Sequence, residues 1–248
     1  MVTLMSRLDE LLATVEGYRD AMIEEMTAML RIPAMGPENG GEGEFDRARF
    51  IEGLVRRCGF QEVETYESLD DRVKMKVRPS VIARRRGKSK RTIWFISHMD
   101  TVSPGDAKAW TYPPFDGTVA DGKLYGRGSE DNGQAIISTL FALRSMMTIE
   151  EEPAYTIGAA VVADEEAGSD HGIKFLIEKG LFGEDDIFYV PDAGVPDGSV
   201  IEVAEKSIIW LKFRVRGKQV HASTPERGLN ALRIGSEMMV ELSEHLYG

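Results

Sequence analysis

The spacing of apolar residues changes along the chain and predicts where helices give way to strands. Near the N-terminus, apolar residues recur every three or four positions from Leu8 to Met29. This period predicts one amphipathic helix that ends before the Gly/Pro-rich loop at 33–44. A second helix is expected near 45–58, because Gly59 follows it as a stop signal.

Further along, apolar runs with strand character alternate with helical patterns. The strand candidates are 63–68, 81–86, the continuous apolar run 92–97, 155–163 and 186–190. Helical patterns follow Asp131 and cover 171–180. The basic run between the second and third strands is expected to be a solvated hairpin tip. The alternation predicts an α/β fold: a mostly parallel-centred mixed sheet flanked by helices.

The pattern changes again near residue 205. A long alternating strand at 200–217 is followed by a loop and a helix over 218–246. We therefore expect a catalytic, metal-binding domain at 1–205 and the first part of a small α+β lid domain at 206–248.

Charge and cysteine content exclude several classes of function. Lys and Arg number 30 against 41 Asp and Glu, which gives a net charge of −11 and argues against nucleic acid or an anionic membrane as partner. A single cysteine, Cys58, excludes an internal disulfide and fits a reducing, cytoplasmic location. No stretch resembles a signal peptide or is apolar enough to span a bilayer.

Most residues that could bind a ligand or act in catalysis follow the predicted buried strands directly. Open α/β sheets bind ligands just outside the carboxyl ends of their strands, so residues distant in sequence meet there. The residues concerned are His98 and Asp100 after the run at 92–97, Asp131 at a helix start, Asp164, Glu165 and Glu166 after 155–163, and Asp192 after 186–190.

One histidine with several carboxylates is the ligand set of a divalent cation such as zinc. Asp100 suits an outer role, in which its carboxylate orients the ring of His98. A carboxylate shared by two cations would complete a two-metal hydrolytic site. Of Glu165 and Glu166, one could bind metal while the other moves protons, and the sequence leaves that choice open. An acidic loop that begins a helix is the alternative for this pair.

Three separated segments carry a resemblance to a known family. "HMDTVSPGDAKAWTYPPFDGTVADGKLYGRGSEDNG", "DEEAGS" and "HASTPERGLNA" resemble the co-catalytic zinc exopeptidase and deacylase family. That family includes acetylornithine deacetylase, succinyl-diaminopimelate desuccinylase, aminoacylase and carboxypeptidase G. The resemblance extends from about Leu8 to the end of the chain, with the motifs in the family's order.

The resemblance implies a role for each candidate residue. It assigns His98 and Asp192 to one metal, Asp131 to the bridge, Glu166 to the second metal, Asp100 to orienting His98, Glu165 to the general base and His221 to oxyanion stabilisation in a dimer partner's site. It also implies a cis peptide between Asp131 and Asn132. Two divalent ions are expected, zinc first, with cobalt and manganese as alternatives. His171 and His245 match no family position and are expected at the surface.

The implied activity is hydrolysis of the amide bond of an N-acyl amino acid by a metal-activated water, as in the desuccinylases and deacetylases. A dipeptidase or carboxypeptidase of the same family is the alternative, and a homodimer through the lid is expected. The family has one more histidine on the second metal, in a segment that follows the lid. No candidate for it occurs here, so we also weigh a truncated, non-catalytic metal-binding fragment. An unrelated di-zinc aminopeptidase fits less well, because "HASTPERGLNA" is a lid motif.

Overall fold

The computed structural model describes residues 2–195, 197–204, 209 and 211–247. The chain forms two compact units, Met1–Ile201 and Glu202–Gly248, and each is considered by itself. The predicted domain boundary at 205–206 lies outside the described residues.

A five-stranded mixed sheet forms the centre of the first unit, as the sequence predicts. Its order is β1 (Glu62–Leu69), β2 (Val77–Arg85), β6 (Tyr155–Val162), β3 (Ser89–His98) and β7 (Ile187–Tyr189). The β1–β2 and β2–β6 pairs are antiparallel, whereas β3 is parallel to both β6 and β7. The expected hairpin between β2 and β3 is wrong, because β6 lies between them in the sheet.

The N-terminal apolar stripe forms two helices, α1 (Val2–Glu16) and α2 (Arg19–Leu30), and not one. The break falls at Gly17, which lacks the side chain that favours helix, and at Tyr18, whose φ of −91° and ψ of 0° leave the helical region. The next helix is α3 (Phe45–Arg57), after which Gly59 has a φ of 96°, as a helix stop requires. The remaining helices of this unit are α4 (Gln134–Met146) and α5 (Ile173–Glu178).

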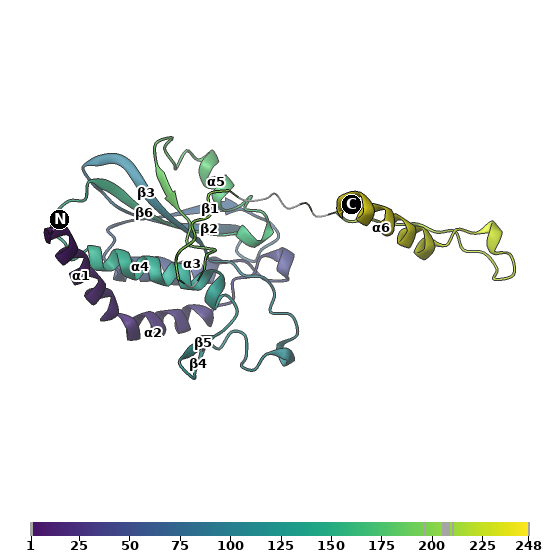
Figure 1. The fold of residues 1–248 in the computed structure, drawn as a ribbon, viewed down its shortest axis with the longest axis horizontal. Helices are drawn as coiled ribbons and strands as arrows, with labels where there is room; N and C mark the ends of the chain where they lie inside the picture. The colour runs from purple at the N-terminus through teal and green to yellow at the C-terminus, as the bar shows by residue number, and fades with distance from the viewer. Residues whose placement is uncertain (1, 196, 205–208, 210, 248) are drawn as a thin grey trace. The chain divides into compact units, whose positions relative to one another are not determined.

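Helices cover both faces of the sheet, which creates two apolar layers (Figure 1). On one face, side chains from α2, α3 and α4 pack against alternate strand residues such as Val81 and Ala159. On the other face, Trp94 and Ile96 pack with Leu176 of α5. Strand residues alternate between these faces, so the central strands are apolar on both sides. The parallel strands β6, β3 and β7 end at one common edge.

The second unit contains a short helical turn at Pro225–Arg227 and the helix α6 (Ala231–Tyr247). The long strand predicted at 200–217 is absent from the described part of that range. A strand needs a partner for its backbone groups, and the described pairing in this unit is one bridge between Lys218 and Leu229. In the described ranges, no helix combines the length and apolarity needed to cross a membrane.

Close packing at the centre of the sheet leads to a direct test of the fold. A Cβ atom at Gly158 would lie 2.3 Å from the ring of Trp94, which is 1% exposed. We expect Gly158→Ala to lower the free energy of unfolding by about 1–3 kcal/mol, the usual cost of overpacking. Gly53→Ala is the control, because its Cβ would meet only the flexible end of Arg57. Equal denaturation midpoints for the two variants in urea would contradict this packing.

Candidate metal centre

His98 is the last residue of β3, and its ring lies among carboxylates from three other segments. Its Nε2 atom is 2.8 Å from Oδ1 of Asp131, which lies in the turn at Ser129–Gly133. The ligand atoms of His98, Asp131 and Glu166 all lie within 4.8 Å of one another. The structure therefore brings together three of the predicted ligands.

Two more predicted residues face the same nitrogen at a greater distance. Glu165 Oε2 and Asp192 Oδ2 each lie 3.9 Å from His98 Nε2. Asp192 follows β7, and its Oδ1 accepts a hydrogen bond from the side-chain amide of Asn132. The peptide bond between Asp131 and Asn132 is cis, as the resemblance implies. The predicted ligands thus surround one histidine nitrogen from several sides.

Asp100 contacts both His98 and the segment that carries Glu165 and Glu166. The Nδ1 atom of His98 lies 3.1 Å from the backbone oxygen of Asp100 and 3.4 Å from its carboxylate. The same carboxylate accepts hydrogen bonds from the backbone N–H groups of Glu165 and Glu166, at 3.1 and 3.0 Å. Asp100 therefore contacts the ring of His98 and also binds the backbone of the segment that carries both glutamates.

The protonation of this cluster reflects crowded negative charge. Burial lowers the pKa of His98, but the carboxylates of Asp100, Glu165 and Asp192 outweigh it and raise the value to about 9. Burial, followed by the charge of Asp131, raises the pKa of Glu166 to about 7. Burial also raises the pKa of Glu165. The raised pKa values mean that His98 and Glu166 hold their protons more strongly than usual, because each proton offsets negative charge in the cluster.

A divalent cation fits the same donors. One imidazole with carboxylate oxygens is a ligand set used for zinc, and a cation would relieve the repulsion that raises these pKa values. His98, Asp131 and Glu166 would hold it, with Asp192 close enough to join after a small movement. In the described part of the chain, no second histidine belongs to the cluster.

Two buried arginines that the sequence patterns did not predict contact the segments that carry the cluster. Arg47 of α3 donates to the backbone oxygen of Met99 at 2.9 Å, and so holds the segment between His98 and Asp100. Burial lowers the pKa of Arg47 to about 10, which still leaves it charged at neutral pH.

Arg78 of β2 is the second of these arginines. It is fully buried, pairs with Glu44 and lies 3.0 Å from Oδ1 of Asp164. Both arginines stand at positions where the period calls for apolar residues, Arg47 on the buried face of α3 and Arg78 within a buried strand. An arginine inside an apolar stripe was the sequence feature that could have indicated these buried charges.

The other three histidines differ in their surroundings. His171 was expected at the surface, but it is partly buried and forms a hydrogen bond with Ser68 at 2.9 Å, because the loop after β6 folds back onto β1. His245 is exposed on α6. His221 is exposed in the second unit, where its Nδ1 lies 2.8 Å from Ser223 Oγ.

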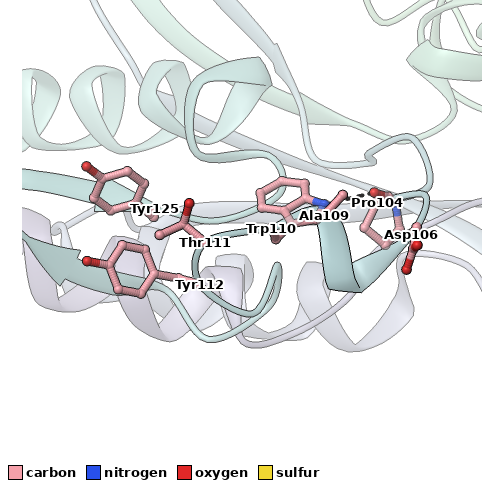
Figure 2. Close-up of a pocket in the computed structure, with 7 residues that line it drawn as sticks. All are labelled: Pro104, Asp106, Ala109, Trp110, Thr111, Tyr112 and Tyr125. Atoms are coloured by element: carbon pink, nitrogen blue, oxygen red, sulfur yellow. Dashed lines mark hydrogen bonds between the residues drawn. The ribbon is translucent and has the colours of Figure 1, made fainter.

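A cavity of about 320 Å³ is lined by residues of the chain segment 104–125, which follows Asp100 and precedes Asp131 in the sequence (Figure 2). Its lining includes Trp110, Tyr112 and Tyr125. The one carboxylate in the lining, Asp106, accepts a hydrogen bond from the backbone of Lys108. The cavity therefore offers apolar surface and not a second cluster of metal ligands.

Sequence comparison matches more than half of the chain to a known family. Residues 94–245 match Peptidase family M20/M25/M40. An uncharacterised metallohydrolase of Methanocaldococcus jannaschii is 38% identical over 88% of this chain and 55% of its own length. Succinyl-diaminopimelate desuccinylase of Paracoccus denitrificans is 31% identical over 67% of this chain and 44% of its own. The chain thus spans about half the length of these relatives.

A solved structure shares the fold. The dipeptidase Dug1p of Saccharomyces cerevisiae aligns with 75% of this chain and 41% of its own, with a TM-score of 0.63 and 18% identity. At that identity the likeness concerns the fold.

Removing one ligand tests the cluster. We expect Asp131→Asn to weaken zinc binding by more than about 100-fold, because outer-shell partners alone typically account for 10–100-fold. Asp121→Asn is the matched control, since Asp121 lies in the hairpin turn between β4 (Thr118–Ala120) and β5 (Lys123–Tyr125). Competition with a chromophoric chelator measures both affinities. Equal zinc affinity in Asp131→Asn and the unmodified chain would remove Asp131 from the site.

Proposed function

This chain belongs to Peptidase family M20/M25/M40, and we propose that it supplies the metal-binding cluster of a metal-dependent hydrolase that cleaves an amide bond of an N-acyl amino acid or short peptide. The observation that carries this proposal is the cluster of His98, Asp131 and Glu166, with a further carboxylate, Glu165, beside it. A hydrolytic site requires a base that stands beside the cation without binding it, and the position of Glu165 suits that role.

The proposed roles follow from the surroundings of each group. A bound divalent cation would polarise the amide carbonyl and lower the pKa of water, and His98, Asp131, Glu166 and Asp192 would hold it. We assign the general base to Glu165, because its carboxylate lies 3.9 Å from His98 Nε2 without belonging to the set of proposed ligands. Glu165 accepts a proton from the attacking water and then donates it to the leaving amine. We also propose that a second cation would share the carboxylate of Asp131 with the first.

The substrate class rests on the relatives. A relative named succinyl-diaminopimelate desuccinylase supports an N-succinyl or similar N-acyl amino acid as substrate. A dipeptide is the second candidate substrate, because the solved structure that shares the fold is that of a dipeptidase. It ranks second because that likeness concerns the fold alone. Both substrates present an amide carbonyl beside a carboxylate, and the same cation and base would act on either.

His221 is proposed to stabilise the oxyanion in the site of a second copy. The backbone N–H of Ser223 donates to Nδ1 of His221, so in the neutral ring the proton resides on Nε2. An Nε2–H group is the kind of donor that oxyanion stabilisation needs. We accordingly assign 206–248 to the first part of a lid through which two copies associate.

The central test replaces the proposed base and keeps the proposed ligands. We expect Glu165→Gln to lower kcat for a hydrolysed N-acyl amino acid by about 10²–10⁴-fold, the usual share of general acid–base catalysis. Zinc content, measured by elemental analysis, should remain that of the unmodified chain. Equal hydrolysis by both proteins would exclude Glu165 as the base. Bound zinc without hydrolysis in either protein would favour the alternative of a non-catalytic metal-binding fragment.

Mixing two inactive variants tests the role of His221. Glu165→Gln and His221→Ala should each be nearly inactive alone. If His221 acts in the site of a second copy, a mixture should regain activity, because one of the two sites in each mixed dimer then has both groups. An unchanged, low rate in the mixture would argue against action between copies. Lys218→Ala, on the same segment, is the control and should keep most of its activity without mixing.

A further inference from the structure

The two glutamates of the site have few side-chain contacts of their own. Among the described residues, no side chain donates a hydrogen bond to either carboxylate, and Glu165 only approaches His98 at 3.9 Å. Their directions therefore depend on the backbone that carries them, the loop 164–171. Whatever fixes this loop also fixes the proposed base and one proposed ligand.

The loop is closed at its base by Asp164. This residue has a left-handed φ of 65°, and its backbone oxygen accepts a hydrogen bond from Ser169 at 2.6 Å. Its Oδ2 atom accepts from the backbone N–H of His171 at 2.9 Å. The first and last residues of the loop are thus joined, and Arg78 contacts Asp164 from beneath.

The far end of the loop is attached to β1 by the side chain of His171. Arg72 Nη2 lies 3.3 Å from Nε2 of His171, and a guanidinium can only donate. In the tautomer that accepts from Arg72, Nδ1 carries the proton and donates to Oγ of Ser68 at 2.9 Å. Oδ2 of Asp70 also lies 3.4 Å from Nε2. Ser68 and the neighbouring Asp70 are 6% and 5% exposed. The acceptor of this hydrogen bond is therefore shielded from water, which strengthens the bond.

The contact between His171 and the end of β1 is linked to the buried residue Arg78 through Asp70. Asp70 receives two hydrogen bonds from the side chain of Arg72 and one from its backbone N–H. It also lies 3.7 Å from Arg78, which in turn contacts Asp164. Arg78 therefore bridges the strand end that receives His171 and the residue that begins the loop. Both ends of the loop are held to the same rigid part of the sheet.

We propose that His171 is a positioning residue, which anchors the loop 164–171 to Ser68 on β1 and thereby sets the directions of Glu165 and Glu166. The inference rests on the proposed function. A displacement of about 1 Å in a catalytic group can cost about 100-fold in rate. A loose loop would accordingly weaken metal binding through Glu166 and slow proton transfer through Glu165, although His171 touches neither metal nor substrate.

The experiment compares zinc affinity and loop exchange in matched variants. His171→Leu should weaken zinc binding by about 10-fold or more, the usual effect of an outer-shell partner. His171→Asn should restore most of it, because its amide N–H can donate to Ser68 as Nδ1 does. Ser68→Ala should match His171→Leu, and the double variant should be no weaker than either single one. Lys174→Ala is the control, because it breaks an exposed ion pair with Asp170 of the loop and leaves the contact between His171 and Ser68 in place.

Amide hydrogen exchange in the metal-free chain separates this inference from the proposed function. His171→Leu should speed exchange at the N–H groups of Glu165 and Glu166 and leave α4 unchanged. If the unmodified chain binds no zinc but exchange still rises, the proposed function fails and the anchoring stands. Unchanged loop exchange, or zinc affinity equal in His171→Leu and the unmodified chain, would overturn the inference. Equal losses in His171→Asn and His171→Leu would do so too.

Discussion

Repulsion between carboxylates at one edge of the sheet is the constraint on which the rest of this structure depends. Asp100 and Asp164 are buried there, and the carboxylates of Asp131, Glu165, Glu166 and Asp192 lie in front of them. Buried charge without a partner is strongly destabilising. The fold supplies positive charge from behind through Arg47 and Arg78, and a bound cation would supply it from the front.

This arrangement explains why Asp100 occupies the centre. Its backbone oxygen and carboxylate face the ring of His98, and the carboxylate also receives the N–H groups of both glutamates. One buried side chain therefore couples a ligand on β3 to a loop that follows β6. Because β3 and β6 are adjacent and parallel, their ends stay in register and the coupling needs no long connection.

The sequence predicted the mixed α/β fold and the residues that gather at the sheet edge, because apolar strands that end in acidic residues or histidine carry that information locally. It did not predict the break at Gly17, since an apolar stripe continues across it. It also misassigned the partner of β2, because the insertion of β6 between β2 and β3 is a long-range pairing that no local period records.

The roles of Arg47, Arg78 and His171 were missed for a related reason. Each depends on a partner far away in the sequence, and none belongs to a motif of fixed spacing. An arginine in an apolar stripe signals a buried ion pair without naming its partner. The long strand predicted at 200–217 fails in its described part because alternation describes a strand only where a neighbouring strand exists.

The most direct test of the central claim is the position of a bound metal. Crystals of the chain grown with zinc, measured on both sides of the zinc absorption edge, locate the ion by its anomalous scattering. The account predicts a peak in contact with Nε2 of His98 and the carboxylates of Asp131 and Glu166. Zinc found only elsewhere, or no peak beside His98 at saturating zinc, would contradict it.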